Sequence, residues 1–144
     1  MTTGQIFLIL LAMILFSTIY LTAYNNLFDQ ADLAYKGMYI LNGQKITDKY
    51  FQEIEANILG EIVLFDSLQT IYNGLSDTLT VSDIDYHINI STTPCTKTGA
   101  DTTTVTPEFL RIDISMWAIP PDGDTLWIGM PQFPISKVFV DLYY

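Results

Sequence analysis

The chain has 144 residues, with six basic and sixteen acidic side chains and a net charge of −10. A surface this acidic repels nucleic acid and anionic lipid headgroups, so no nucleic-acid partner is expected. The single cysteine, Cys95, excludes an internal disulfide framework and a cysteine-based metal site. It leaves a free thiol and an intermolecular bond as alternatives.

The first predicted element is a membrane-spanning helix. Residues 5–28 hold no charged side chain, and their centre is apolar apart from Ser17, Thr18 and Tyr20. About 17–20 such residues cross a hydrocarbon layer of ~30 Å as a helix, and a lone span in lipid must be helical to satisfy its own backbone. We therefore expect one span, over residues 6–24. A buried helix of a soluble core is the alternative, but a domain of this size rarely buries a helix that is apolar all round.

The helix is predicted to continue past the membrane surface to about residue 40. Three aromatic residues are placed to form a belt where the span leaves lipid, namely Tyr20, Tyr24 and Phe28. Beyond this belt, apolar residues recur at helical spacing, at Leu27, Ala31, Ala34 or Tyr35, and Met38. A helix over residues 5–40 is ~54 Å long at about 1.5 Å per residue. Because a bilayer needs less than this, the surplus turns must lie in water and pack against another surface.

A break is predicted at residues 41–47, where Asn42-Gly43 is a turn dipeptide. A second, amphipathic helix is predicted from Asp48 to Tyr72, with Thr47 as its N-cap and Asn73-Gly74 as its C-terminal stop. Its apolar residues lie three or four apart and form one stripe, made of Phe51, Ile54, Ile58, Ile62, Phe65, Leu68 and Tyr72.

After Gly74 the apolar period changes to two, which is typical of half-buried strands. The alternation predicts four strands, around residues 84–90, 110–118, 125–130 and 138–142, with a Thr-rich loop at 91–107 and a PPDGD turn at 120–124. Such strands imply an antiparallel sheet with one buried face. The cover is the stripe of the second helix, the projecting half of the first helix, or both, and we expect the stripe to pack on Ile84, Tyr86, Ile112 and Ile114. The expected fold class is α+β: a long N-terminal transmembrane helix, a second amphipathic helix and a small antiparallel β-sheet head.

No motif of known catalytic chemistry is present: the chain has no Gly-rich phosphate loop, nucleophile elbow or HExxH pair. We therefore predict no enzyme activity, no cofactor and no metal site. Asp83, Asp85 and His87 share one strand face, where a weak cation site is geometrically feasible, but a solvated polar face is the better interpretation. For Asp122 and Asp124, simple turn chemistry is favoured over calcium binding.

Two further features lie on the predicted sheet. Trp117 and Trp127 flank the PPDGD turn and are expected to pack as cross-strand partners rather than to form a platform for an aromatic ligand. Asn89-Ile90-Ser91 is an N-glycosylation sequon, which makes Asn89 a candidate acceptor if the domain is exported in a glycosylating organism.

A glycine–glutamine junction, Gly4-Gln5, stands immediately before the long apolar helix. This arrangement resembles the class III signal peptide of the archaeal type IV pilin-like superfamily, in which a peptidase cuts after the glycine and the hydrophobic helix then forms a filament core. The resemblance implies a leader at residues 1–4, a first mature residue at Gln5, an assembly helix at 5–40 and a head at 41–144. Its assembly residues would include Ile6, Phe7, Leu8, Leu11, Leu15 and Ile19.

The resemblance also implies a function and a location. The protein would be a structural subunit, major or minor, of a pilin-like surface filament or a related secretion or adhesion assembly. Its partners would be copies of itself or related pilin-like subunits, and it would be a single-pass membrane protein with an extracellular head. Because the same helix can stay in lipid, the alternative is a membrane-anchored exodomain that forms no filament, such as an archaellum-stator-like or accessory complex subunit.

Overall fold

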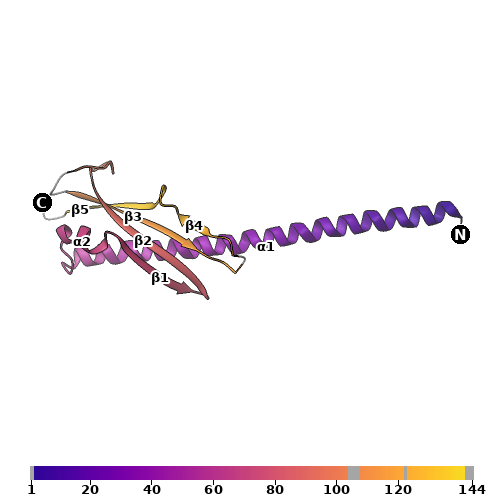
Figure 1. Ribbon diagram of the computed structural model, residues 1–144, viewed down its shortest axis with the longest axis horizontal. Helices are drawn as coiled ribbons and strands as arrows, with labels where there is room; N and C mark the ends of the chain where they lie inside the picture. The colour runs from indigo at the N-terminus through magenta and orange to yellow at the C-terminus, as the bar shows by residue number, and fades with distance from the viewer. Residues whose placement is uncertain (1, 104–107, 122, 142–144) are drawn as a thin grey trace. The chain divides into compact units, whose positions relative to one another are not determined.

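The computed structural model describes residues 2–103, 108–121 and 123–141. Its elements in chain order are α1 (Thr3–Leu59), η1 (Phe65–Ser67), α2 (Leu68–Tyr72), β1 (Leu75–Val81), β2 (Ile84–Cys95), β3 (Phe109–Ala118), β4 (Leu126–Gly129) and β5 (Ile135–Val140). Figure 1 labels α1, α2 and the five strands. The expected α+β class is confirmed: a long apolar N-terminal helix, a short second helix and a small antiparallel sheet. The chain divides into two compact units, one up to Met38 and one from Tyr39 onward, which we call the head.

The break predicted at residues 41–47 is wrong, because α1 runs through it as continuous helix. Gly43 is buried there and lies against β4 instead of forming a turn: a Cβ atom on this residue would stand 2.6 Å from Cδ1 of Ile128. Glycine at this position therefore allows the helix to approach the sheet closely. Thr47, predicted as an N-cap, is 1% exposed inside the helix, and its hydroxyl donates to the carbonyl of Gly43 at 3.1 Å.

Helix α1 ends at Leu59, about thirteen residues before the predicted end of the second helix at Tyr72. Glu61 has a φ of 55°, its N–H donates to the carbonyl of Ile58, and the N–H of Ile62 donates to that of Asn57. This is a Schellman motif, in which a left-handed residue closes the last helical turn. The predicted helix over 48–72 is thus divided into the end of α1, a turn, η1 and α2.

The division separates the predicted apolar stripe into parts. Phe51, Ile54 and Ile58 are buried from α1, and Phe65 and Leu68 are buried from η1 and α2, as expected. The prediction is wrong for one member, Ile62, which lies in the turn and is 75% exposed.

The five strands form one antiparallel sheet in the order β1-β2-β3-β4, and β5 also pairs with β3. Strands β2, β3, β4 and β5 correspond to the four predicted strands, although β2 extends to Cys95 into the region predicted as loop. Strand β1 was not predicted. It forms a hairpin with β2 through Ser82 and Asp83, whose φ angles of 54° and 62° are those of a type I′ turn.

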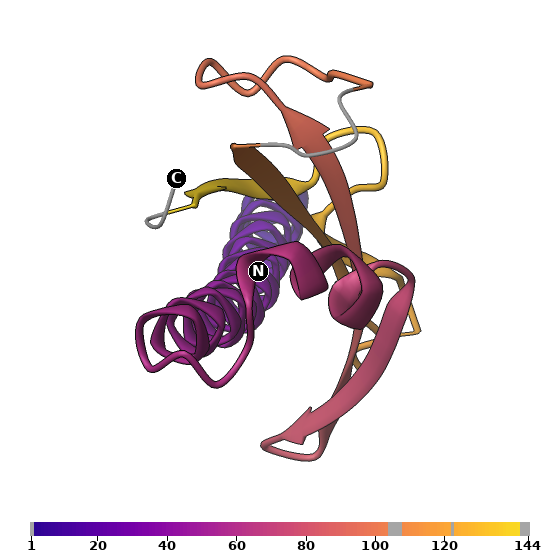
Figure 2. The same cartoon turned by 90° about the vertical axis from the view of Figure 1, so that its left-hand side faces the viewer.

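The core lies between one face of this sheet and the helical segments of the head. The buried face carries alternate residues of β2 and β3, namely Tyr86, Ile88, Ile90, Ile112, Ile114 and Met116. The last turns of α1 and the η1–α2 segment cover this face, and Figure 2 shows both on the same side of the strands. The opposite face of the sheet carries the polar residues and the two tryptophans.

Candidate functional site

The N-terminal half of α1 is exposed at every position from residue 2 to residue 35. Its most apolar 18-residue window has a mean hydropathy of 2.5, and none of it is buried. The six predicted assembly residues lie in this stretch, with exposed fractions between 44% at Leu11 and 67% at Ile19. By length and composition this helix can cross a membrane. An apolar surface of this size is unfavourable in water, so lipid or other helices must cover it.

The two threonine hydroxyls in the apolar stretch are hydrogen-bonded within the helix itself. The Thr18 hydroxyl donates to the carbonyl of Ile14 at 2.8 Å, and the Thr22 hydroxyl donates to the carbonyl of Thr18 at 2.9 Å. Such back-bonding removes the main cost of placing these groups in a hydrocarbon layer.

The Gly4-Gln5 junction lies in the first turn of α1. The side-chain oxygen of Gln5 accepts a hydrogen bond from the N–H of Thr2 at 3.1 Å. A Cβ atom on Gly4 would meet nothing within 4 Å. The fold therefore has no steric need for glycine at position 4, although glycine costs about 1 kcal/mol relative to alanine inside a helix.

The predicted aromatic belt forms a continuous ridge of rings along the helix. The ring centroids of Tyr20 and Tyr24 are 6.4 Å apart, and those of Tyr24 and Phe28 are 4.7 Å apart. One and two turns further on, Asp32 and Lys36 form an ion pair at 2.9 Å. The first charged residue of the chain, Asp29, directly follows the last ring of this ridge.

In the head, the acidic residues considered for cation binding do not converge. Asp83 occupies the β1–β2 turn, Asp85 accepts a hydrogen bond from Thr80 at 2.6 Å, and His87 is hydrogen-bonded to Thr78 at 3.1 Å. Within residues 2–103, 108–121 and 123–141, no group of three His, Cys, Asp or Glu side chains is placed to hold a metal ion. The prediction for Asp122 lies outside the described residues.

The predicted tryptophan pair is confirmed. Trp117 and Trp127 are cross-strand partners with ring centroids 5.4 Å apart, and His87 stacks on Trp117 at 5.3 Å. Because Trp117 has a neighbouring ring on either side, this row of rings packs against itself. On the same face, the sequon residue Asn89 is exposed, and its side-chain oxygen accepts a hydrogen bond from Ser76 at 2.7 Å.

A charged cluster that the sequence reasoning missed surrounds Arg111. Its Nε donates to both carboxylate oxygens of Asp113 at 3.0 Å, and its Nη1 donates to Asp101 and to the carbonyl of Gly99, each at 2.7 Å. Ser136 of β5 also donates to Asp113, at 2.5 Å. The alternation of β3 placed Arg111 and Asp113 on its polar side. The partners on the 96–101 turn and on β5, however, are brought in by tertiary structure.

Cys95 lies beside this cluster and is 3% exposed. Burial raises the pKa of its thiol, while the nearby Arg111 lowers it and Asp101 raises it further. A thiol this deeply buried is poorly placed to bond with another chain, which favours the free thiol of the two alternatives.

A second missed contact joins α1 to β1. The Tyr50 hydroxyl donates to the carboxylate of Asp77. Burial, together with the hydrogen bond and the charge of Asp77, raises the pKa of Tyr50 to about 12, and the same hydrogen bond lowers the pKa of Asp77. No helical or strand pattern in the sequence relates these two residues.

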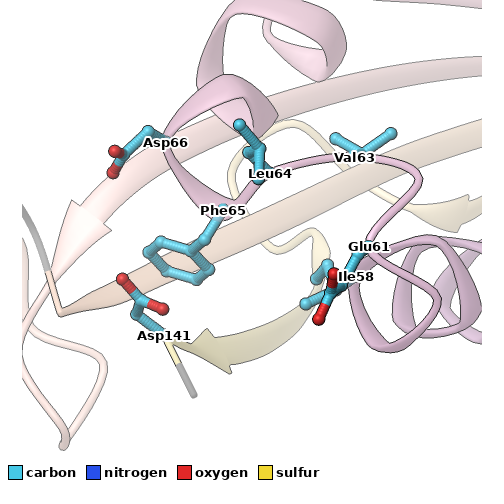
Figure 3. Close-up of a pocket in the computed structure, with 7 residues that line it drawn as sticks. All are labelled: Ile58, Glu61, Val63, Leu64, Phe65, Asp66 and Asp141. Carbon is cyan, nitrogen blue, oxygen red and sulfur yellow. The ribbon is translucent and has the colours of Figure 1, made fainter. Parts of the chain in front are cut away.

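A pocket of about 230 Å³ opens where α1 ends, lined by Ile58, Glu61, Val63, Leu64, Phe65, Asp66 and Asp141. Figure 3 shows the Phe65 ring next to the Asp141 carboxylate, and Glu61 beside Ile58. The volume of this pocket is below the roughly 300–1,000 Å³ of typical small-molecule sites. We assign it no ligand.

Comparison of the chain with protein-family models, with curated proteins and with solved structures finds no match. Function must therefore be argued from the geometry alone. In the described part of the head, Arg111 is hydrogen-bonded to Asp113 and Tyr50 to Asp77, in two separate contacts. The two tryptophans pack against each other. The N-terminal half of α1 is the surface that needs a binding partner, because it is apolar and exposed.

Proposed function

We propose that the protein is a structural subunit, major or minor, of a pilin-like surface filament or a related secretion or adhesion assembly. The N-terminal half of α1 is its assembly helix. The observation that carries this proposal is the contrast between two parts of one helix. Residues 2–35 are exposed and largely apolar, whereas Ile46, Ile54 and Ile58 of the same helix lie in the core of the head.

The physical argument concerns what can cover the exposed part. Each Å² of apolar surface removed from water is worth about 25 cal/mol, so the helix is stable only in lipid or among other apolar helices. Copies of the same helix satisfy this requirement as well as lipid does. In this proposal the head is extracellular, residues 1–4 are a leader, and Gln5 becomes the first mature residue. The partners are copies of this chain or related subunits, with no cofactor and no catalytic role.

A second candidate function is a single-pass membrane-anchored exodomain, stator-like or accessory to a larger complex. It is favoured by the hydroxyl groups of Thr18 and Thr22, which bond within the helix and so need no protein partner. In this case the helix remains in lipid and the head alone makes contacts.

Position 4 separates the two candidates. In Gly4→Leu the new side chain has free space, so the fold should be unaffected, but a bulky residue before the cleavage point should block processing. Protein from cell membranes and from sheared surface material is compared by mass spectrometry of its N-terminus. We expect wild-type protein to begin at Gln5 and to occur in the sheared material. Gly4→Leu should accumulate in the membrane as the longer precursor.

Thr2→Leu is the matched control, since it adds the same side chain to the leader and leaves Gly4 intact. It should be processed like the wild type. If wild-type protein keeps its N-terminus, never appears in sheared material and behaves like Gly4→Leu, the assembly function is wrong and the anchored exodomain replaces it.

A further inference from the structure

One side of α1 remains apolar after the helix has left the predicted span at residues 6–24. Counting 100° per residue, seven of the eight apolar residues from 24 to 38 fall within about a third of the helix circumference, and the eighth, Leu33, lies on the other side. They are spaced in steps of three and four, as in helices that pack on other helices. We call this set the extramembrane face; it consists of Tyr24, Leu27, Phe28, Ala31, Ala34, Tyr35 and Met38.

The charged residues of this segment lie on the opposite side of the helix. Asp29, Asp32 and Lys36 follow one another in steps of three and four, and their centre lies about 130° around the helix from the centre of the extramembrane face. Asp32 and Lys36 pair with each other at 2.9 Å. Two copies of this acidic chain can therefore bring their extramembrane faces together without placing charged residues of this segment in the contact.

Lipid cannot cover the whole of this face. About 20 helical residues already cross the hydrocarbon layer, so a span over 6–24 leaves Leu27 to Met38 on the water side. Every member of the face is exposed, from 43% at Met38 to 64% at Leu27 among the large side chains. The face needs an occupant that is itself apolar and stands at the same height above the membrane.

The exposed area of the extramembrane face is comparable to the area that one partner buries in a standard protein–protein interface. The three aromatic members, Tyr24, Phe28 and Tyr35, are 51–60% exposed, and at ~150–250 Å² per aromatic side chain they present on the order of 350 Å². A standard interface buries ~800 Å² per partner. The aromatics supply nearly half of this. Leu27, Met38 and the adjoining apolar span supply the rest, while Ala31 and Ala34 let a second helix come close.

We propose that the extramembrane face packs against the extramembrane face of a second copy of this chain, as a helix–helix contact just outside the membrane. The inference rests on the proposed function in one respect: it takes the assembly helix as the device that brings copies together. It adds the side of the helix that makes the contact, and it extends the contact beyond the apolar span.

The test introduces one additional cysteine at a time into the full chain, which keeps Cys95, and uses membranes of the cells that make the protein. Ala31→Cys and Ala34→Cys place a thiol within the face, and their neighbours Asp32→Cys and Leu33→Cys place one on the other side. After oxidation with copper phenanthroline, non-reducing gels measure the yield of dimer. We expect several-fold more dimer from positions 31 and 34 than from 32 and 33. Unaltered protein, whose Cys95 is 3% exposed, gives the background.

Three results would overturn the inference: equal yields on both sides of the helix, no dimer from any position, or a cross-linked product that contains a different protein. The assay needs no filament and no processing. Sheared filaments without cross-links at 31 and 34 would therefore refute the face and leave the proposed function standing. Cross-links confined to 31 and 34, with no filament and no cleavage at Gly4, would support the face and refute the filament.

Discussion

Truncation of Ile54 tests how the head is packed. Ile54 is 1% exposed on the side of α1 that covers the sheet. Ile54→Ala removes three carbon atoms, worth about 0.8 kcal/mol each, and leaves a cavity, so a loss of ~2–5 kcal/mol is typical. Alanine is the better helix former by at most ~0.7 kcal/mol, which offsets a small part of this. We expect a net loss of about 3 kcal/mol in the free energy of unfolding.

Ile62 provides a matched control, because the sequence places it on the same apolar stripe as Ile54. The structure puts it in the turn after α1, where it is 75% exposed. Ile62→Ala should therefore change the free energy of unfolding by no more than ~0.5 kcal/mol. Glu55→Ala is a poorer control, since Glu55 forms an ion pair with Lys137 at 2.8 Å.

The assay is thermal unfolding of the full chain in a mild detergent, followed by near-ultraviolet circular dichroism of the packed tryptophans. For a domain of this size, 1 kcal/mol shifts Tm by about 4–8 °C. Ile54→Ala should lower Tm by more than ~10 °C and Ile62→Ala by little. Equal large shifts would mean that one uninterrupted stripe is buried and that the helix end at Leu59 is wrong. Equal small shifts would mean that α1 does not form the core.

Two further predictions concern contacts that only the structure brings to view. Gly43→Ala should destabilise the head by about 1–3 kcal/mol, because the new Cβ atom would stand 2.6 Å from Cδ1 of Ile128. Gly37→Ala is the control and should not lower Tm, because a Cβ atom there meets nothing within 4 Å. Equal effects of the two variants would refute the close approach of α1 to Ile128. Because the pKa of Tyr50 is raised to about 12, its contribution to stability is complete below pH 10 and is lost as the pH rises from 10 to 12. In a tyrosinate absorbance titration Tyr50→Phe should remove a late-titrating group, and an unchanged curve would contradict the bond to Asp77.

Several elements follow from the sequence because their signals are local. The charge-free stretch at 5–28 demands a helix in any apolar surrounding, since the backbone must satisfy itself. The alternation of β2 and β3 places Tyr86, Ile88 and Ile114 on one face whatever covers it, because successive strand residues point to opposite sides. The pairing of Trp117 with Trp127 follows from a turn signal between two alternating segments.

The candidate assembly surface was also accessible from the sequence, but in part. Composition predicts the apolar helix, and spacing predicts its continuation to Met38. Which residues of the helix belong to the core of the head is a tertiary question. Within the head, Ile46 and Ile54 of α1 are buried.

Other features were decided by tertiary structure against the local signal. Asn42-Gly43 is a turn dipeptide, yet Gly43 stays helical because the missing side chain lets α1 lie close to Ile128. Strand β1 was not predicted, because Asp77 interrupts the apolar alternation on the side of the strand that faces α1. There the Asp77 carboxylate accepts a hydrogen bond from the Tyr50 hydroxyl.

The end of α1 and the charged cluster around Arg111 also depend on tertiary contacts and not on the local sequence pattern. Glu61 adopts the left-handed conformation that closes α1, which a glutamate adopts only when the following chain is held elsewhere, here by the buried Phe65 and Leu68. Arg111 donates to Asp101, ten residues before it, and its partner Asp113 accepts a hydrogen bond from Ser136, twenty-three residues further along the chain. Periodicity reports which side of an element is apolar, and the sequence by itself determined that much. Which element covers that side, and where the chain must bend to reach it, depends on contacts between distant residues.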